Sequence, residues 1–419
     1  MKNIFHKARK SNVEYKTLCA LPWVHLDILP DGKVLHCCLT QRYDAFAGDI
    51  NKQSIAEIWN SEYMKAIRSK MIQGEEPIEC TTCYEKERIS GTSLRISYNK
   101  TFESKLKEIP EITRKDGRVD KLDLRHWHFQ FNNLCNFKCR ICGPDASSAW
   151  IPDAKKLGWL DNGASDRPTK IEKVGQLTSL DFFLKNIHTI EQISFAGGEP
   201  LMVDENWKIL DYLDEHKRYD IRLSFNSNLS ILKYKNRDAL DYWKKWGRRV
   251  SVFPSIDEID DRAELLRRGT NWKNIEENLK AVSNIGIVVE PYITVSAMNV
   301  GRLPEILDRL IDLGVIKGEN GDYRNFELNI LYSSPIFHVS ILPDDIRLEI
   351  RQRLESYAEE FEKKYNTTIR DRFAHVLWHL EKPWHEKNSL DFKEFTKTLD
   401  TIRGENTLAV IPELACVLK

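Results

Sequence analysis

Nine cysteines carry most of the chemistry that this sequence suggests, and eight of them fall into two groups separated by about fifty residues. The first group comprises Cys19, Cys37, Cys38, Cys80 and Cys83, the second comprises Cys135, Cys139 and Cys142, and Cys416 stands alone near the C-terminus. An odd number of cysteines, two C-x2-C spacings and no apolar segment after the basic residues 1–10 favour metal ligation over disulfide bonds. We therefore interpret both groups as metal-binding.

The second group has the spacing C-x3-C-x2-C and directly follows a predicted strand at residues 122–131. Three thiolates can hold one face of a metal cluster and leave one coordination position free for another ligand. A closed structural zinc site needs four protein ligands, so a zinc site here would require a distant histidine. The residues alone leave three interpretations open: an open cluster site, such a zinc site, or cysteines that only pack.

With its flanking segment 133–136, this triplet strongly resembles the cluster motif of the radical S-adenosylmethionine (SAM) enzymes. The resemblance implies that Cys135, Cys139 and Cys142 hold a [4Fe-4S] cluster whose fourth iron is chelated by the amino and carboxylate groups of SAM. One departure is Ile141, where the family usually has an aromatic residue. This departure removes no ligand.

A second motif follows the next predicted strand, at residues 192–196. Its two glycines allow the backbone to approach a ligand closely, and its carboxylate can accept hydrogen bonds from an ammonium group. In isolation such a sequence is more often an ordinary turn. Because it lies one strand-helix unit after the cysteines, it resembles the family's motif whose backbone and glutamate contact the methionine amine of SAM. The residues are Gly197, Gly198, Glu199 and Pro200.

Three later strand ends and one arginine complete the resemblance. The polar segments are residues 223–228, 253–257 and 294–299. The SAM contacts that the resemblance assigns to them are Asn226, Ser255, Asp257 and Val295. Of these, Val295 is expected to pack on the adenine. An arginine that pairs with the methionine carboxylate is expected at Arg267, whereas Arg268 is expected on a solvated face. Taken singly, each of these residues could equally well have a purely structural role. Taken together, they follow successive strands in the order that the resemblance predicts.

The first cysteine group has the spacing C-x12-G-x4-C, from Cys19 through Gly32 to Cys37, followed by Cys80 and Cys83 as C-x2-C. From spacing alone, a structural zinc ribbon is an alternative. The pattern resembles the auxiliary-cluster motif of SPASM and twitch domains, which implies that these four cysteines hold a second [4Fe-4S] cluster. One set of four cysteines corresponds to the shorter twitch form. In the family this module usually follows the catalytic domain, whereas here it precedes it.

Cys37 and Cys38 are neighbours, and adjacent side chains on an extended strand point in opposite directions. We therefore expect only one of them to be a ligand, and the spacing from Gly32 selects Cys37.

Strand-like and helix-like segments alternate over more than 200 residues, which predicts an α/β fold with a parallel sheet, open or partly closed as a barrel. The predicted strands are 122–131, 192–196, 222–226, 250–256, 288–295 and 326–331, and the clearest helices are 54–72, 205–216, 272–285 and 303–313. We predict a partial (β/α)6 TIM-like barrel, in which chemistry gathers at the C-terminal ends of the strands. The expected division is a small twitch-like iron-sulfur module at 1–112, the barrel at 113–345 and a helical C-terminal extension at 346–419.

Charge and hydropathy exclude several classes of protein. The chain has 63 basic and 63 acidic residues, so no global field attracts a nucleic-acid backbone or an anionic bilayer. No window approaches eighteen uninterrupted apolar residues. We therefore expect a soluble cytoplasmic protein without a membrane segment, and we consider nucleic acid an unlikely partner; an RNA-modifying enzyme would need a basic stripe that the sequence lacks.

The resemblance implies reductive cleavage of SAM to a 5′-deoxyadenosyl radical that abstracts a hydrogen atom from the substrate, with flavodoxin or ferredoxin as electron donor. Four cysteines would leave no iron of the second cluster free, so this cluster is expected to accept an electron in a net oxidation or bond formation. A peptide or protein side chain is the first expectation for the substrate, and a sugar or nucleotide is the alternative. A non-catalytic iron-sulfur or zinc-binding protein is the alternative from another class.

Histidine and tryptophan side chains are also concentrated near the C-terminus. They are His375, Trp378, His379, Trp384 and His385. They could line a site, but a partly buried helix is the more common explanation of such a pattern.

Overall fold

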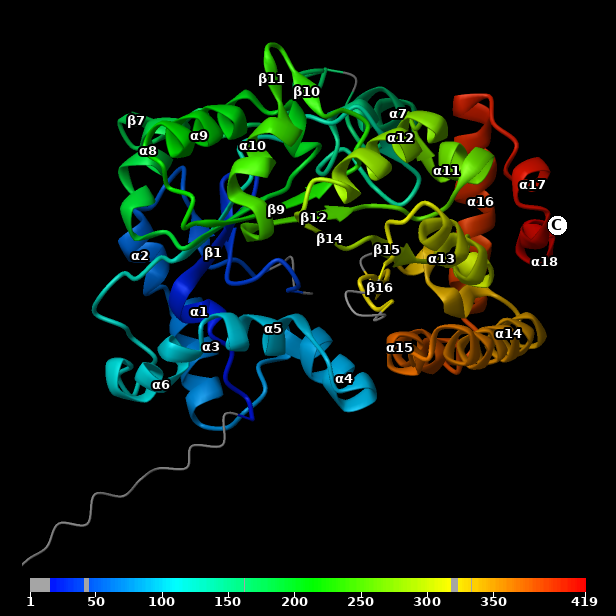
Figure 1. Ribbon diagram of the computed structural model, residues 1–419, viewed down its shortest axis with the longest axis horizontal. Coiled ribbons are helices and arrows are strands. Elements are labelled where there is room, and N and C mark those ends of the chain that lie inside the picture. The colour runs from blue at the N-terminus through cyan, green and yellow to red at the C-terminus, as the bar shows by residue number, and fades with distance from the viewer. Residues whose placement is uncertain (1–15, 41–44, 162, 318–322, 333) are drawn as a thin grey trace, which may run out of the picture.

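The computed structural model describes residues 16–40, 45–161, 163–317, 323–332 and 334–419 (Figure 1). The basic residues 1–10 lie outside this range. Six parallel strands occupy the predicted positions: β4 (His126–Phe129), β8 (Gln192–Phe195), β9 (Arg222–Ser227), β12 (Val250–Pro254), β15 (Tyr292–Val295) and β16 (Glu327–Ile330). Strands β4, β8, β9 and β12 pair in this order, and β15 pairs with β16. The predicted partial (β/α)6 barrel is confirmed.

The fifth predicted strand is interrupted. Residues 288–295 form β14 (Val288–Val289), which pairs with β12, and then β15, which pairs with β16. Pro291 lies between the two, and proline has no N–H to donate to a neighbouring strand. A bridge between Ser255 and Tyr292 carries the sheet across this break.

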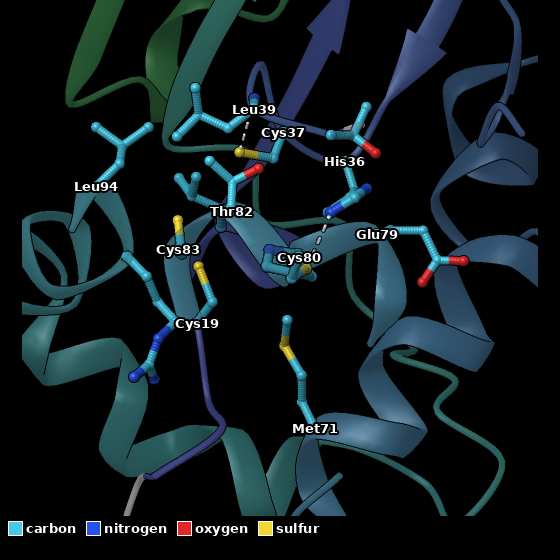
Figure 2. A pocket seen from close by; sticks show the side chains of 14 residues that line it. Cys19, His36, Cys37, Leu39, Met71, Glu79, Cys80, Thr82, Cys83 and Leu94 are labelled. Carbon is cyan, nitrogen blue, oxygen red and sulfur yellow. Dashed lines mark hydrogen bonds between the residues drawn. The ribbon is translucent and has the colours of Figure 1, made fainter. Parts of the chain in front are cut away.

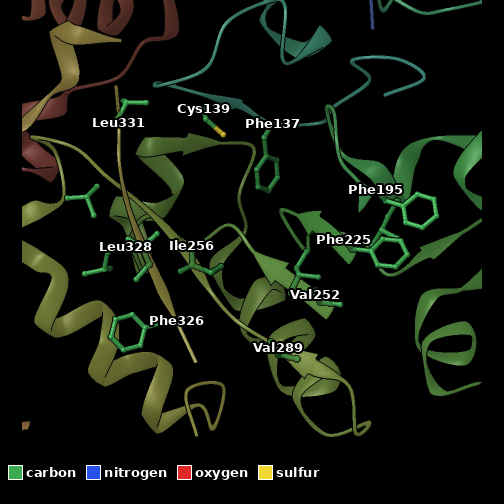
Figure 3. Packing of buried hydrophobic residues seen from close by; sticks show 14 of the residues in the cluster. Phe137, Cys139, Phe195, Phe225, Val252, Ile256, Val289, Phe326, Leu328 and Leu331 are labelled. Atoms are coloured by element: carbon green, nitrogen blue, oxygen red, sulfur yellow. The ribbon is translucent and has the colours of Figure 1, made fainter. Parts of the chain in front are cut away.

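Helices cover the outer face of the barrel because that face of each strand is apolar. They are α8 (Ser179–Lys185), α9 (Asp204–Glu215), α10 (Ala239–Trp246), α11 (Asp260–Leu266), α12 (Trp272–Ser283) and α13 (Leu303–Asp312). Phe195 and Phe225, from neighbouring strands, stack with ring centroids 4.6 Å apart, and Phe225 also contacts Trp243 of α10 (Figure 3). Successive side chains alternate between the two faces of a strand, so the residues directly before and after each of these aromatics point into the barrel.

Residues before the barrel extend the same sheet. Strand β1 (His25–Ile28) pairs in parallel with β4, and β2 (Lys33–Leu35) and β3 (Gly48–Asp49) follow in antiparallel order. Leu26 and Ile28 belong to the same apolar cluster as Trp127 of the barrel. Strand β1 therefore shares its core with the barrel, whereas Leu18, Leu21 and Trp23 belong to a second apolar cluster with residues of helices that follow β3 in the chain. The division of the chain at residues 112 and 345 stays a prediction.

Helices surround the N-terminal cysteines. They are α1 (Leu21–Val24), α2 (Ile55–Trp59), α3 (Glu62–Ile72), α4 (Thr81–Ser90), α5 (Leu94–Thr101) and α6 (Glu103–Ile112). The predicted helix 54–72 is thus two helices. Its break falls at Ser61, whose Oγ accepts the N–H of Met64 at 3.4 Å and starts a new helix.

The C-terminal extension is helical, as predicted. It comprises α14 (Asp344–Tyr365), α15 (Arg370–Leu380), α16 (Glu386–Arg403), α17 (Thr407–Val410) and α18 (Ala415–Leu418). Figure 1 shows α15 opposite α4 at the lower edge of the molecule and α16 along its side. Of the helices described, none is long and apolar enough to cross a membrane.

Replacing Leu26 by alanine tests whether β1 is part of the barrel core. Leu26 is fully buried, so Leu26→Ala should lower the free energy of unfolding by about 2–5 kcal/mol, because it removes apolar contacts and leaves a cavity. Urea unfolding monitored by circular dichroism measures the change. The matched control is Leu348→Ala, at a leucine that is 55% exposed on α14, with an expected change within about 0.5 kcal/mol. An unchanged urea midpoint for Leu26→Ala would contradict a shared core.

Candidate functional site

The cysteine triplet lies in the loop after β4, at the C-terminal end of the sheet. Cys139 belongs to the short strand β5 (Lys138–Cys139), which pairs with β13 (Arg267–Arg268) so that Cys139 is opposite Arg267. A hydrogen bond with Cys142 lowers the pKa of Cys139 to about 7, and Arg267 adds to this effect against the opposing effect of burial. The Phe137 N–H points at the Cys135 sulfur, at 3.4 Å. The loop therefore collects donors and positive charge around its thiols.

The Gly-Gly-Glu-Pro turn packs directly against this loop. Gly197 and Gly198 both have positive φ angles, of 83° and 53°. A Cβ atom on Gly198 would lie 2.1 Å from the carbonyl oxygen of Leu134, and one on Gly197 would lie 2.8 Å from the Gln130 side chain. The Glu199 N–H donates to the same Leu134 carbonyl at 2.8 Å. Only glycine fits this approach of one backbone to another.

The carboxylate of Glu199 is fully buried and joins the ends of two strands. It accepts hydrogen bonds from the Ser227 hydroxyl at 2.8 Å and from the N–H groups of Asn228 at 2.7 Å and Leu201 at 3.2 Å. Burial raises the pKa of Glu199 to about 7, and these donors oppose the increase. Pro200 begins a short 3-10 helix directly after it. Contact between Glu199 and the methionine amine stays a prediction, since both of its oxygens already serve protein donors.

Ser227 and Asn228 are site residues that the sequence analysis did not select. The selected neighbour, Asn226, is exposed on the inner face of β9. Asn228 is buried, and its amide nitrogen lies 3.0 Å from Asn136 Oδ1 and 4.0 Å from Cys135 Sγ. The signal in the sequence was the pair of polar residues immediately after the strand.

Asp257 and Arg267 form a buried ion pair beside the cysteine loop. Arg267 Nη1 lies 2.7 Å from Asp257 Oδ2, and Asp257 Oδ1 accepts the N–H of Thr294 at 2.8 Å. Burial acts to lower the pKa of Arg267, but Cys139 and Asp257 raise it overall, so the guanidinium stays charged. Its Nε is buried without a hydrogen-bond partner. Arg268 instead points outward, with a side chain 44% exposed that pairs with Glu405 at 2.6 Å.

Ser255 and Val295 lie at the same edge of the sheet but differ in their access to it. Ser255 is half-buried, and its N–H donates to the carbonyl oxygen of Ser227 at 3.0 Å. Val295 is fully buried in the apolar core, on the face of β15 opposite to the partly exposed Thr294. Both assignments as SAM contacts stay predictions. Because the side chain of Val295 points into the apolar core, only the backbone of this residue faces the barrel interior.

The residues at this edge fit a [4Fe-4S] cluster with SAM. The loop itself carries three thiols, which leaves one iron of a cluster without a cysteine from the loop. The two glycines form a cradle that a Cβ atom would fill. The Nε of Arg267, which has no hydrogen-bond partner among the described residues, is available to a carboxylate.

The four N-terminal cysteines line one small pocket (Figure 2). They are Cys19, Cys37, Cys80 and Cys83. Burial is the main cause that raises the pKa of Cys19 and of Cys80, and the other thiols of the set raise it further. Four thiols that disfavour one another's ionisation need a cation to become thiolates, which fits a metal cluster. Cys38 is exposed and is not part of the lining.

His36 adds a polar contact to this pocket. One of its ring nitrogens, Nε2, lies 3.4 Å from the Cys80 sulfur (Figure 2). The other lies 2.9 Å from the Tyr63 hydroxyl. Hydrogen bonds to sulfur ligands are one way in which a protein sets the potential of an iron-sulfur cluster.

The C-terminal extension braces the triplet loop. Arg140, between the second and third cysteines, is 1% exposed and pairs with Asp400 and Glu405. Arg403 Nε donates to Asp153 at 2.8 Å, and Lys138 pairs with the same carboxylate at 2.9 Å. The helix α16 thus holds the loop from outside the barrel.

The C-terminal histidines separate into two kinds. His375 and His379 are buried on α15, and burial lowers the pKa of His375 to about 4 and of His379 to about 2. Trp384 is 46% exposed, and His385 is exposed.

Comparison with known families agrees with this geometry. The radical SAM superfamily matches residues 129–310, and the iron-sulfur cluster-binding domain SPASM matches residues 19–84. The two matches cover more than half of the chain, in the order that the cysteines predicted, with the auxiliary domain first. The chain belongs to the radical SAM superfamily of enzymes and carries an N-terminal SPASM domain.

Named relatives share only part of the chain. The GTP 3′,8-cyclase of Campylobacter lari is 24% identical over 159 residues, which are 37% of this chain and 42% of the relative. The probable GTP 3′,8-cyclase of Methanococcus maripaludis is 24% identical over 201 residues, which are 46% and 57%. This chain therefore spans about half the length of the curated relatives it matches. Among solved structures, Streptococcus suis SuiB bound to the precursor peptide SuiA aligns with 64% of this chain and 53% of SuiB, at 16% identity and a TM-score of 0.40.

Neighbouring cysteines provide a matched test of the auxiliary site. Cys37→Ser should lower the iron content of the reconstituted protein from about eight to about four per chain, because one thiolate of the buried set is lost. Cys38→Ser, at an exposed thiol, should leave it near eight. Iron counting with the absorbance near 400 nm measures both. Equal iron loss in the two variants, or loss only in Cys38→Ser, would contradict the assignment.

Neighbouring arginines provide a second matched pair. Arg267→Gln should weaken SAM binding by about 10- to 100-fold, because it removes a buried charged donor, whereas Arg268→Gln should change it less than twofold. Equilibrium dialysis of labelled SAM with the anaerobically reconstituted protein measures the dissociation constants. Arg267→Lys keeps a positive charge beside Asp257 but lacks the planar set of guanidinium N–H donors. It therefore separates the effect of losing those donors from the effect of a misfolded protein. A larger effect at Arg268 would contradict the assignment.

Proposed function

We propose that the protein is a radical SAM enzyme that abstracts a hydrogen atom from its substrate at the C-terminal edge of the barrel. The observation that carries this proposal is the meeting of three elements at that edge: the open set of Cys135, Cys139 and Cys142, the glycine cradle at 197–198, and the buried Arg267 with an unpartnered Nε.

The bound cofactors would supply the reactive chemistry: one electron from the [4Fe-4S] cluster breaks the sulfonium C5′–S bond of SAM, giving methionine and a 5′-deoxyadenosyl radical that takes a hydrogen atom from the substrate. The protein's residues bind and orient. Arg267, held by Asp257, would bind the methionine carboxylate, and Gly197 and Gly198 would give the methionine access to backbone groups. Glu199, with Ser227 and Asn228, would keep the ends of β8 and β9 in register.

The SPASM domain would hold a second [4Fe-4S] cluster through Cys19, Cys37, Cys80 and Cys83. With four cysteines, every iron has a protein ligand, so this cluster would accept the electron left on the substrate radical and the net reaction would be an oxidation or bond formation. A flavodoxin or ferredoxin would supply the electron for SAM cleavage.

The inner face of the sheet favours a substrate without a phosphate chain. His128 Nδ1 lies 3.0 Å from Asp27, and His126 Nε2 lies 2.8 Å from the Ser194 hydroxyl, which meets Ser224 at 2.8 Å. Among the inward-facing residues of β1, β4, β8, β9 and β12, Arg222 is the one arginine or lysine, and its guanidinium lies over the ring of Phe102. This largely neutral, hydrogen-bonding surface supports a peptide or protein side chain as the substrate.

A nucleotide is the second candidate substrate, because the curated relatives are named GTP 3′,8-cyclases. A triphosphate would need cations at the site, which the strands just named do not supply. Stimulation of 5′-deoxyadenosine formation by GTP, and not by peptides, would favour this candidate.

The test of SAM cleavage is formation of 5′-deoxyadenosine with dithionite after anaerobic reconstitution. Wild type should contain about eight irons and release 5′-deoxyadenosine, whereas a Cys135/Cys139/Cys142 triple alanine variant should contain about four and release none. Cys416→Ala, at an exposed thiol far along the chain, is the control and should behave as wild type. Zinc in place of iron, or equal product from the triple variant, would contradict the proposal in favour of a cysteine scaffold without catalysis.

A further inference from the structure

Three metal-ligating side chains that belong to neither cysteine set meet between the helix that carries Cys83 and the C-terminal extension. Glu85 lies on α4, two residues beyond Cys83, and His375 and His379 lie on α15, about 290 residues later in the chain. One ligand atom of each lies within 4.8 Å of the other two. Figure 1 shows these two helices facing each other. The meeting is therefore a product of the tertiary fold.

The two histidines have the spacing and burial of a ligand pair. Residues four apart lie on the same face of a helix, so both imidazoles point toward α4. They are only 2% and 4% exposed, whereas Glu85 is half-buried. Imidazole nitrogens and a carboxylate oxygen are the donors that Zn²⁺ and related divalent transition metals prefer.

A tyrosine hydroxyl occupies the centre of this group. Tyr332, just after β16, places its oxygen 2.8 Å from His375 Nε2 and 3.0 Å from His379 Nε2. The Tyr332 hydroxyl also meets the Glu85 carboxylate, so it can donate its one hydrogen there while its oxygen accepts from both imidazoles. His375 Nδ1 is buried with no hydrogen-bond partner in any case. Hydrogen bonding alone thus leaves a polar atom of this cluster unsatisfied.

The second nitrogen of His379 is held in the manner of a metal ligand. His379 Nδ1 lies 2.9 Å from His338 Nε2, and His338 Nδ1 lies 2.8 Å from the Ser340 hydroxyl. Metal-binding histidines commonly use their other ring nitrogen in such a hydrogen bond, which fixes the tautomer and the ring orientation. His338 Nδ1 also accepts the Ser340 N–H at 3.2 Å. A metal on His379 Nε2 therefore requires the tautomers in which His379 Nδ1 donates to His338 and His338 Nδ1 donates to the Ser340 hydroxyl, so that the Ser340 N–H gives up this acceptor.

Two cations near the group, Lys86 and Arg372, are compensated by one carboxylate. Lys86 is adjacent to Glu85, and it pairs with Glu327 of β16. Arg372 Nη1 of α15 lies 2.7 Å from the other oxygen of the same carboxylate. These ion pairs also hold α4, β16 and α15 together next to the histidines.

We propose that Glu85, His375 and His379 bind one divalent metal ion, Zn²⁺ or a close relative, with the oxygen of Tyr332 as the fourth donor. The ion would join the helix that carries Cys80 and Cys83 to the C-terminal extension. This site does not depend on the proposed reaction, because none of its ligands belongs to the cysteine sets.

Zinc binding to the full chain with its clusters reconstituted tests the proposal. Wild type should bind one more zinc per chain than Glu85→Gln or His379→Gln, at the same iron content, by mass-spectrometric metal analysis. The zinc X-ray absorption spectrum should show nitrogen and oxygen ligands at about 2.0–2.1 Å without sulfur. Zinc should raise the thermal unfolding midpoint of wild type and not of the variants. His385→Gln, at an exposed histidine, is the control and should bind as wild type.

Equal zinc in wild type and variants, or a zinc spectrum made up of sulfur ligands, would overturn the proposal and leave a hydrogen-bonded seam around Tyr332. If His379→Gln fails to fold, Glu85→Gln at a half-buried position decides alone. An unchanged iron content and 5′-deoxyadenosine yield in a variant that has lost zinc separates this site from the proposed activity.

Discussion

The candidate site depends on a backbone-to-backbone contact that only glycine allows. The turn after β8 and the cysteine loop after β4 approach so closely that a Cβ on Gly198 would lie 2.1 Å from the Leu134 carbonyl oxygen. The Glu199 N–H bonds to that carbonyl, and its buried carboxylate gathers donors from the end of β9. Three consecutive strand ends are thereby fixed to one another. Any displacement of this turn would move the thiols relative to Glu199 and the strand ends that it joins.

The second constraint is electrostatic. Arg267 is buried between the carboxylate of Asp257 and the thiol of Cys139, and a buried cation is stable only when it is paired. Asp257 is itself held by the Thr294 N–H, and among the described residues the buried Nε of Arg267 has no hydrogen-bond partner. From the outer side, Arg140 pairs with Asp400 and Glu405. The C-terminal extension thus contributes to the position of the cysteine loop.

The two cysteine sites are parts of one folded body. Strand β1 pairs with β4 and shares the apolar core of the barrel, whereas the residues around Cys19, Cys37 and Cys80 pack in a second apolar cluster at the start of β1. Because the SPASM domain precedes the barrel in the chain, its sheet extends the barrel at the β4 edge. The inner faces of β1 and β4 lie between the cluster sites, and they carry the histidines and Asp27 that we associate with substrate.

The sequence by itself determined the class of fold, because strand periodicity predicted all six barrel strands. It also predicted the candidate ligands, because the C-x3-C-x2-C motif, the paired glycines and the step from Gly32 to Cys37 depend on local spacing. It missed contacts between distant segments. These contacts join residues that are from 28 to about 290 positions apart in the chain. They are the hydrogen bonds of Ser227 and Asn228 to Glu199, the ion pairs of Arg140 with Asp400 and Glu405, the pairing of β1 with β4, and the meeting of Glu85 with His375 and His379. No periodicity encodes such partners, because they are decided by how whole elements pack. For Arg267 over Arg268 and Cys37 over Cys38, which the sequence already preferred, the tertiary structure added the physical reason that the preferred residue of each pair is the less exposed one.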